Sequence, residues 1–175
     1  VWNGDENVKV RISDFHTNIT LIEKNGEAIF SPVAQKGEEK PVTDRTCLNV
    51  ETIVDFAESC DIEDIREMIE RQIEYNSAIS AEGLSGDYGA NIGQTLLQMY
   101  GKHDIKALAK ARAAAGSDAR MNGCELPVII VSGSGNQGIT ACMPVVAYAE
   151  HMGVSKEEMI RAVAVSDLLT IHMKT

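Results

Sequence analysis

The sequence predicts an α+β fold, with a small strand-rich N-terminal subdomain and linker over residues 1–46 and a mainly helical domain over residues 47–175. Two observations lead to this prediction. Before residue 47, apolar and polar residues alternate, which is the period of a half-buried strand. After it, apolar residues recur at spacings of three and four behind helix-capping residues, as in amphipathic helices.

Three strands are expected in the N-terminal part. Residues 8–12 alternate apolar and polar side chains, and two further strands at 19–22 and 28–30 flank a turn that contains Asn25-Gly26. An Asn-Gly pair between apolar runs is typical of a β-hairpin. Residues 31–46 are polar, contain two prolines and read as a loop or linker. Because three strands make a marginal sheet, this part needs further packing to be stable.

Helix starts are marked by capping residues at Asn49, Asp61 and Ser155, the last with Glu158 three residues on as a capping box. Gly116 is the expected end of an Ala-rich helix. The expected helices are 50–59, 62 to about 79, 92–100, 104–115, a helix-like stretch at 139–151, and 156 to about 173.

Charge and hydropathy exclude several classes of protein. The net charge is −10 and the isoelectric point is near 4.8, which is opposite to the charge that neutralises nucleic-acid phosphates. No apolar run approaches the ~20 residues of a membrane span, and no signal peptide is visible, so we expect a cytoplasmic protein. The ends suggest a piece of a longer protein. The oligomeric state is not predicted, and a homo-oligomer is compatible with the sequence.

The four cysteines do not form a known metal-binding pattern. Cys47, Cys60, Cys124 and Cys142 are spaced 13, 64 and 18 residues apart, unlike zinc or ferredoxin motifs. Cys142 lies in an apolar helical pattern and is expected in the core, and Cys60 lies at an expected helix end. Cys124 alone stands beside glycine-rich segments. No metal ligand is therefore predicted in this chain.

Residues 132–138 form a glycine-rich heptad, Ser-Gly-Ser-Gly-Asn-Gln-Gly, between an apolar run and a helical stretch. It matches the dinucleotide motif G-x-G-x-x-G, but no second strand ending in an acidic residue follows, so NAD is not expected. It also resembles a phosphate-binding P-loop, but Ile139 stands where the lysine belongs. Two interpretations remain: a tight turn into a helix, or a nest of amides for a small carboxylate.

The carboxylate interpretation defines the candidate substrate-binding residues. Backbone amides of the heptad and polar side chains that donate hydrogen bonds without adding charge suit a carboxylate. The heptad candidates are Ser132, Ser134, Gly135, Asn136, Gln137, Gly138 and Thr140. Upstream, Arg120 is a candidate to bind or orient the carboxylate with Asp118 holding it, although the pair could equally form a solvated turn. No catalytic base is assigned.

These segments together resemble a known family. Residues 116–128, which include Gly-Ser-Asp-Ala-Arg, and residues 132–140 are similar to the serine-dehydratase-α-like family, which includes L-cysteine desulfidase. His16-Thr17-Asn18-Ile19 and residues 22–26 resemble the N-terminal half of the same proteins. The resemblance implies a [4Fe-4S] enzyme, without pyridoxal phosphate, that removes the β-substituent of L-cysteine or L-serine to give pyruvate and ammonia, with sulfide from cysteine. The heptad would hold the substrate carboxylate.

The resemblance also implies that this chain is an internal part of a longer enzyme. Family members are more than twice this length, and the resemblance places their cluster-binding cysteines beyond the end of this chain, which alone should be inactive. It would contribute part of the amino-acid site and no metal ligand. The alternative is a regulatory or ligand-binding module that binds a small amino acid without chemistry.

Overall fold

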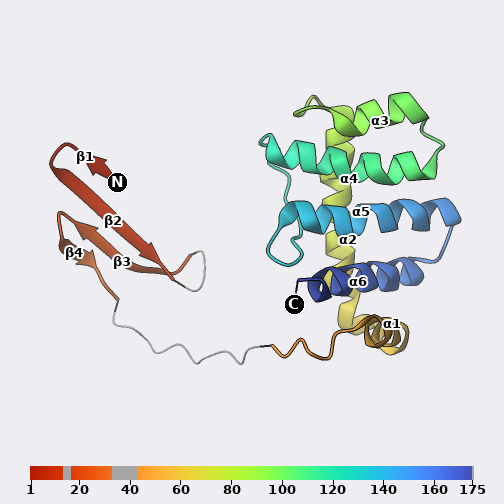
Figure 1. Cartoon of the computed structure of the whole chain (residues 1–175), viewed down its shortest axis with the longest axis horizontal. Helices are drawn as coiled ribbons and strands as arrows, with labels where there is room; N and C mark the ends of the chain where they lie inside the picture. The colour runs from red at the N-terminus through yellow and green to blue at the C-terminus, as the bar shows by residue number, and fades with distance from the viewer. Residues whose placement is uncertain (14–16, 33–42, 175) are drawn as a thin grey trace. The chain divides into compact units, whose positions relative to one another are not determined.

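A computed structural model of the chain describes residues 1–13, 17–32 and 43–174. It contains two compact units, Val1–Thr43 and Asp44–Thr175, which are described separately. The first unit holds an antiparallel sheet and the second holds six helices (Figure 1). The predicted α+β class is confirmed. His16 and most of the expected linker lie outside the described residues.

The sheet of the first unit is a four-stranded antiparallel meander in the order β1-β2-β3-β4. Its strands are β1 (Trp2–Asn3), β2 (Glu6–Ile12), β3 (Ile19–Lys24) and β4 (Glu27–Phe30). The hairpin turn predicted at Asn25-Gly26 is confirmed, since both residues have positive φ, at 53° and 84°. The asparagine side chain also accepts from the amide of Asn7, 2.7 Å away, which ties the turn to β2. The short strand β1 was not predicted.

Over its described residues, the second unit contains six helices, and all but α3 begin at a residue whose own side chain caps the helix. They are α1 (Val50–Ser59), α2 (Ile62–Ser85), α3 (Ile92–Tyr100), α4 (Ile105–Met121), α5 (Gly135–Met152) and α6 (Lys156–His172). The starts predicted at Asn49, Asp61 and Ser155 are confirmed, because each side chain accepts from a backbone amide of its first turn. Both Asn49 and Ser155 form complete capping boxes.

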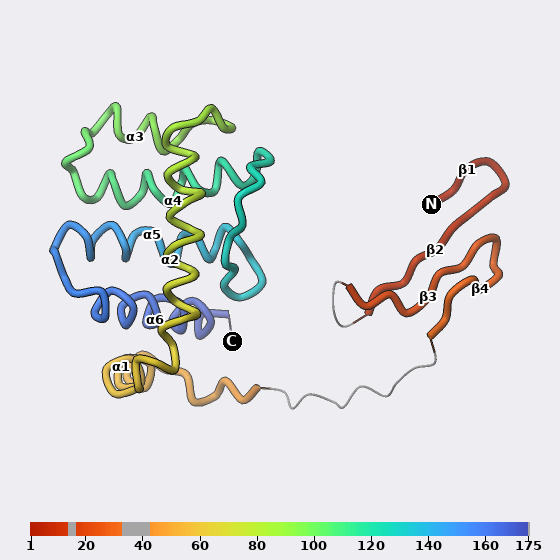
Figure 2. The backbone as a smooth tube through the Cα atoms, turned by 180° about the vertical axis from the view of Figure 1, so that it is seen from behind, coloured from red at the N-terminus to blue at the C-terminus, as the bar shows by residue number. Residues whose placement is uncertain are grey.

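Helices α3, α4, α5 and α6 lie side by side, and the long helix α2 crosses all four (Figures 1 and 2). Helix α1 packs against α6. The core lies where α2 meets this layer, and it contains Ile69, Ile79, Ile139, Met143, Ile160 and Val163. Ends of neighbouring helices therefore meet at the edges of the layer, and residues distant in sequence come together there.

Two helix ends predicted from the sequence are wrong. Helix α4 continues through Gly116 to Met121, and α2 continues past Ile79 to Ser85. Gly116 is buried at a helix crossing, where a Cβ atom would lie 3.0 Å from Ile139 and 3.4 Å from Ser80. The glycine is required for close packing between helices and does not end one.

The apolar run before the heptad is only partly buried. No strand forms over residues 126–130, and the side chains of Leu126 and Ile130 are 40% and 57% exposed. Only Val131, at the end of the run, is buried. Instead of pairing with a strand, the backbone of Ile129 pairs with the side chain of Asn76 on α2. The absence of a Rossmann sheet in the described residues agrees with the prediction.

Candidate functional site

The glycine-rich heptad forms a tight turn that leads into α5. Val131 and Ser134 exchange two backbone hydrogen bonds, of 3.2 and 3.1 Å, and the residues between them, Ser132 and Gly133, have φ of 49° and 80°. Positive φ at both central positions is the pattern of a type I′ turn. The Ser134 hydroxyl then caps α5 by accepting from the amide of Gln137 at 3.3 Å. The heptad thus forms both the turn that precedes α5 and the cap at its amino end.

Two glycines of the heptad allow other groups to approach the start of α5 closely. A Cβ atom on Gly138 would collide with the carbonyl oxygen of Ile129, so the backbone of the preceding segment lies directly on the helix. A Cβ atom on Gly135 would collide with the guanidinium of Arg120, which lies across the first turn. At Gly138 the contact is with backbone, so packing alone requires glycine there, whereas at Gly135 the contact is with the end of a flexible side chain.

Arg120 and Asn136 form the polar centre of this site. The Arg120 Nη1 atom donates to Asn136 Oδ1 at 3.0 Å, and both residues lie at the surface, at the end of α4 and the start of α5. With its oxygen engaged, the amide of Asn136 presents its NH₂ group. Within the described part of the chain, Arg120 has no acidic partner, and the backbone N–H groups of Gly135 and Asn136 have no acceptor. A cation, an amide and a helix amino end together favour an anion.

Asp118 has a different role from the one predicted. Its carboxylate accepts from the backbone amide of Ile92 at 2.9 Å and so caps the start of α3, and it does not pair with Arg120. The residue at the usual capping position, Asn91, has a left-handed conformation, and its side chain bonds to Asp87 and to the amide of Tyr88. The cap of α3 is therefore supplied by α4.

The remaining candidates support the turn or the helix. The Thr140 hydroxyl donates to the backbone carbonyls of Asn136 and Gln137, at 2.9 and 3.1 Å, inside its own helix. Lys174, after α6, donates to the carbonyl of Ser132 at 3.2 Å and fixes the turn from a third element. The structure thus brings together Arg120, Gly135 and Asn136.

The iron–sulfur cluster implied by the resemblance does not fit the described residues. Over residues 1–13, 17–32 and 43–174, no group of three or more His, Cys, Asp or Glu side chains is placed to hold a metal. Cys142 is in the core as predicted, where burial raises the pKa of its thiol to about 12. Cys60 caps the end of α1, also as predicted, and Cys47 is exposed. No chemical step through a cluster is derived from this chain.

Cys124 lies beside a hydrogen-bonded phenol. The Tyr88 hydroxyl donates to Glu82 at 3.0 Å, and Glu82 and Cys124 together raise the pKa of Tyr88 to about 12. A phenol held protonated at neutral pH acts as a hydrogen-bond donor and not as a base. Tyr88 therefore does not serve as a base that activates the Cys124 thiol at neutral pH.

A row of buried polar side chains on α2 was not predicted from the sequence. Gln72, Asn76 and Ser80 are at most 2% exposed and each bonds to a different element: Gln72 to Asp167 on α6, Asn76 to Ile129, and Ser80 to a carbonyl of α4. The four-residue spacing, which places all three on one face of α2, was the available signal. Burial raises the pKa of Asp167 to about 6.

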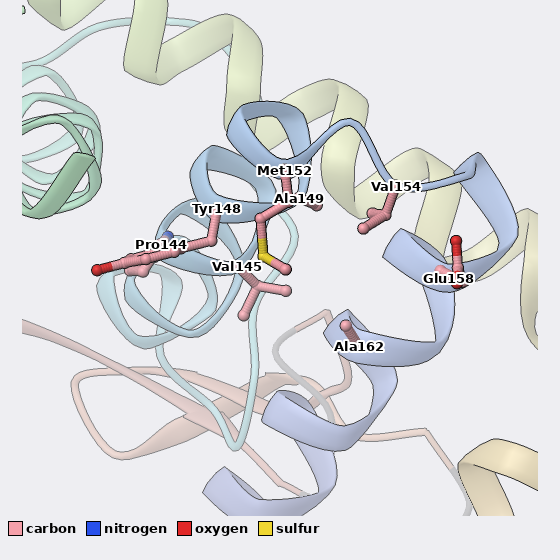
Figure 3. Close-up of a pocket in the computed structure, with 8 residues that line it drawn as sticks. All are labelled: Pro144, Val145, Tyr148, Ala149, Met152, Val154, Glu158 and Ala162. Carbon is pink, nitrogen blue, oxygen red and sulfur yellow. The ribbon is translucent and has the colours of Figure 1, made fainter. Parts of the chain in front are cut away.

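A cavity of about 450 Å³ lies between α5 and α6, away from the heptad (Figure 3). Its wall is apolar, including Val145, Tyr148 and Met152, and its one charged residue is Glu158. The carboxylate of Glu158 accepts from the amide of Ser155 in the capping box, and this bond lowers its pKa. The cavity therefore lacks groups for acid–base chemistry and is not the candidate site.

Comparisons with known proteins identify the family. The model of the serine dehydratase alpha chain family matches residues 11–175, so the chain belongs to this family. It is 54% identical over its whole length to a UPF0597 protein of Desulfitobacterium hafniense, and 48% identical over 98% of its length to a UPF0597 protein of Lachnoclostridium phytofermentans. A UPF0597 protein of Fusobacterium nucleatum is 47% identical over the whole chain.

The chain spans about 40% of the length of these curated relatives, at 40%, 41% and 42%. No solved structure shows a significant match. Among the described residues, no helix has both the length and the apolar character needed to span a membrane. The predicted resemblance to the serine-dehydratase-α-like family is confirmed.

Proposed function

We propose that this chain forms the carboxylate-binding part of an amino-acid lyase that eliminates the β-substituent of L-cysteine or L-serine. L-Serine gives pyruvate and ammonia with no net consumption of water. L-Cysteine and one water give pyruvate, ammonia and hydrogen sulfide. Membership of the serine dehydratase alpha chain family supports the reaction class. The observation that carries the carboxylate site is the Arg120–Asn136 pair at the amino end of α5.

The hydrogen-bond donors at the amino end of α5 suit a carboxylate in both their charge and their number. The free side-chain groups are the NH₂ of Asn136 and the remaining N–H groups of Arg120, and the backbone N–H of Asn136 also lacks an acceptor among the described residues, whereas Gly135 is buried. The amino end of the α5 helix dipole and the guanidinium of Arg120 are both positive, so a bound anion interacts favourably with both. A carboxylate accepts from several such donors with its two oxygens.

The site is also held in place before a ligand binds. Asn76 fixes the segment before the turn, Lys174 fixes the turn itself, and Arg120 fixes Asn136. Donors that need no rearrangement lose less free energy on binding, which favours a small ligand with few contacts. The bound α-carboxylate of an amino acid would thereby orient the adjacent Cα and Cβ, where the reaction takes place.

We place the [4Fe-4S] cluster and the catalytic base outside this chain, in the part of the longer relatives that it does not cover. The described residues offer no ligand set for a cluster, and the cysteine nearest the site on the chain, Cys124, neighbours a phenol with a raised pKa. The function proposed for residues 44–174 is to bind and orient the substrate.

Binding is tested on this chain by calorimetry and by amide NMR shifts with L-serine, using L-serinamide, which lacks the carboxylate, as the ligand control. Asn136→Ala should weaken L-serine binding at least tenfold, since a hydrogen bond to a charged group contributes about 1.5–3 kcal/mol. Gln98→Ala, which removes an exposed amide on α3, should leave the affinity unchanged. Equal affinity of the two ligands, or of wild type and Asn136→Ala, would remove the heptad from the site.

Catalysis is tested separately on the full-length relative from Desulfitobacterium hafniense. The protein is reconstituted anaerobically with iron and sulfide, and pyruvate is assayed from L-cysteine and L-serine. Pyruvate formation that depends on the cluster supports the lyase. Carboxylate-dependent binding without cluster absorbance or pyruvate would instead support the non-catalytic amino-acid-binding module.

A further inference from the structure

A second cavity, of about 310 Å³, lies between α1, α2, α6 and the segment before the heptad. Its walls are apolar, and neither Arg120 nor Asn136 lines it. The apolar lining includes Ile65, Ile69, Ala164 and Leu168. The rim is open, since Phe56, Met68 and Ile130 are 46%, 55% and 57% exposed.

Asp167 is the one ionisable residue in this lining. Its Oδ1 atom accepts from the amide of Gln72 at 3.0 Å, and the two side chains are 9% and 2% exposed. Its Oδ2 atom has no hydrogen-bond partner among the described residues. Among the described residues, every side-chain nitrogen or oxygen atom that is closed off from solvent has a hydrogen-bond partner. Because Oδ2 has no partner, it is not closed off, and Asp167 lines this cavity. The hydroxyl of Ser132 lines the same cavity.

The negative charge of the Asp167 carboxylate has no positively charged neighbour in the cavity lining. Its bonded neighbour Gln72 is neutral, and the lining contains no Lys, Arg or His. A carboxylate among apolar side chains is costly unless a cation or several donors accompany it. A ligand that brings a positive charge with N–H donors removes that cost, and a hydrocarbon chain on the same ligand covers the isoleucines and leucine of the wall.

We propose that this cavity binds a small primary alkylammonium compound, with its nitrogen on Oδ2 of Asp167 and its chain along Ile65, Ile69 and Leu168. The site is separate from the carboxylate site. An amine without a carboxylate gains nothing from Arg120 and Asn136, whose free groups are donors. The two proposals therefore concern different ligands and fail independently.

The probe is n-pentylammonium, and the neutral isostere n-pentanol separates the charge from the hydrocarbon. Binding is measured by calorimetry at pH 7.5 with the 175-residue chain. We expect saturable binding of the amine, at least tenfold tighter than the alcohol. Asp167→Asn keeps the shape and the acceptor for Gln72 but removes the charge, so it should weaken amine binding at least tenfold and leave alcohol binding unchanged.

Asp64→Asn is the matched control, because this exposed aspartate on α2 lies outside the cavity. It should bind the amine as wild type does. Absence of saturable amine binding in wild type, or equal affinity in Asp167→Asn, would overturn the proposal, as would equal weakening in Asp64→Asn.

Methyl NMR on the wild-type chain gives a readout that does not depend on the folding of Asp167→Asn. Shifts caused by the amine should concentrate on Ile69, Ala164 and Leu168. Shifts confined to Val145 and Ala149 in the cavity of Figure 3 would place the amine elsewhere and refute the assignment.

Discussion

Replacing Asn76 by alanine tests how the segment before the heptad is positioned. The Asn76 side chain is fully buried on α2, and it bonds to the backbone of Ile129 in both directions. Ile129 N–H donates to Oδ1 at 3.0 Å, and Nδ2 donates to the Ile129 carbonyl at 3.2 Å. The Asn76 side chain thus makes the two backbone hydrogen bonds with Ile129 that a neighbouring strand would otherwise make.

The expected cost follows from these two bonds. Each contributes about 1 kcal/mol net, and each partner left unpaired costs about 1–3 kcal/mol when it is buried. Ile129 is half-buried, so water replaces part of what the asparagine supplied. We therefore expect the free energy of unfolding to fall by about 2–4 kcal/mol. For a unit of this size, that is a fall in Tm of about 6–15 °C.

Urea unfolding followed by circular dichroism measures the loss, and hydrogen exchange locates it. Amides of residues 129–138 should lose protection, while those in the α3–α4 pair should not. Glu74→Ala, an exposed position on the same helix, is the control and should change stability by less than about 0.5 kcal/mol. A loss below 0.5 kcal/mol in Asn76→Ala would show that the two hydrogen bonds do not position the segment.

Three further perturbations probe other contacts. Gly138→Ala should destabilise the chain by about 1–3 kcal/mol, although alanine is the better helix former, because its Cβ meets the Ile129 carbonyl; a gain in urea midpoint would contradict this. Arg161→Met should cost about 1–3 kcal/mol because Nη1 donates to the carbonyls that end α1, at 2.6 and 3.1 Å, and an equal effect of Arg71→Met, an exposed arginine on α2, would disprove it. The raised pKa of Asp167 favours its protonated form in the folded state, so wild type should lose up to about 3 kcal/mol between pH 4 and pH 7, and Asp167→Asn should not. The stability of wild type minus that of the variant should therefore fall as pH rises, and a flat difference in urea melts would refute this linkage.

Local signals in the sequence predicted much of the fold. The caps at Asn49, Asp61 and Ser155 and the Asn25-Gly26 turn depend on residues within four positions, so their chemistry is visible in the sequence itself. The end of α4 could not be predicted in this way. Gly116 looks like a helix terminator, but its role depends on Ile139, more than twenty positions away.

The candidate site shows the same division. A tight turn into a helix was one of the two interpretations of the heptad, and it depends on glycine spacing and a serine cap, which are local features. The pairing of Arg120 with Asn136 was not predicted, since both were only separate candidates, and Asp118 was assigned the wrong partner. Asp167 gave no signal, because its burial is a property of the packed helices. Side chains whose role depends on burial or on contacts across helices need the tertiary structure.

The carboxylate site is linked to the core through Asn76. The first turn of α5 is packed against the Ile129 carbonyl at Gly138, and the same carbonyl accepts from Asn76. Loss of the asparagine should therefore displace the turn and misplace the amide of Asn136, so Asn76→Ala should weaken L-serine binding although it touches no ligand. Arg161→Met provides the comparison, because it loses similar stability in a contact between α1 and α6. If both variants, measured while folded, bound L-serine as wild type does, the turn would keep its geometry without the hydrogen bonds of Asn76.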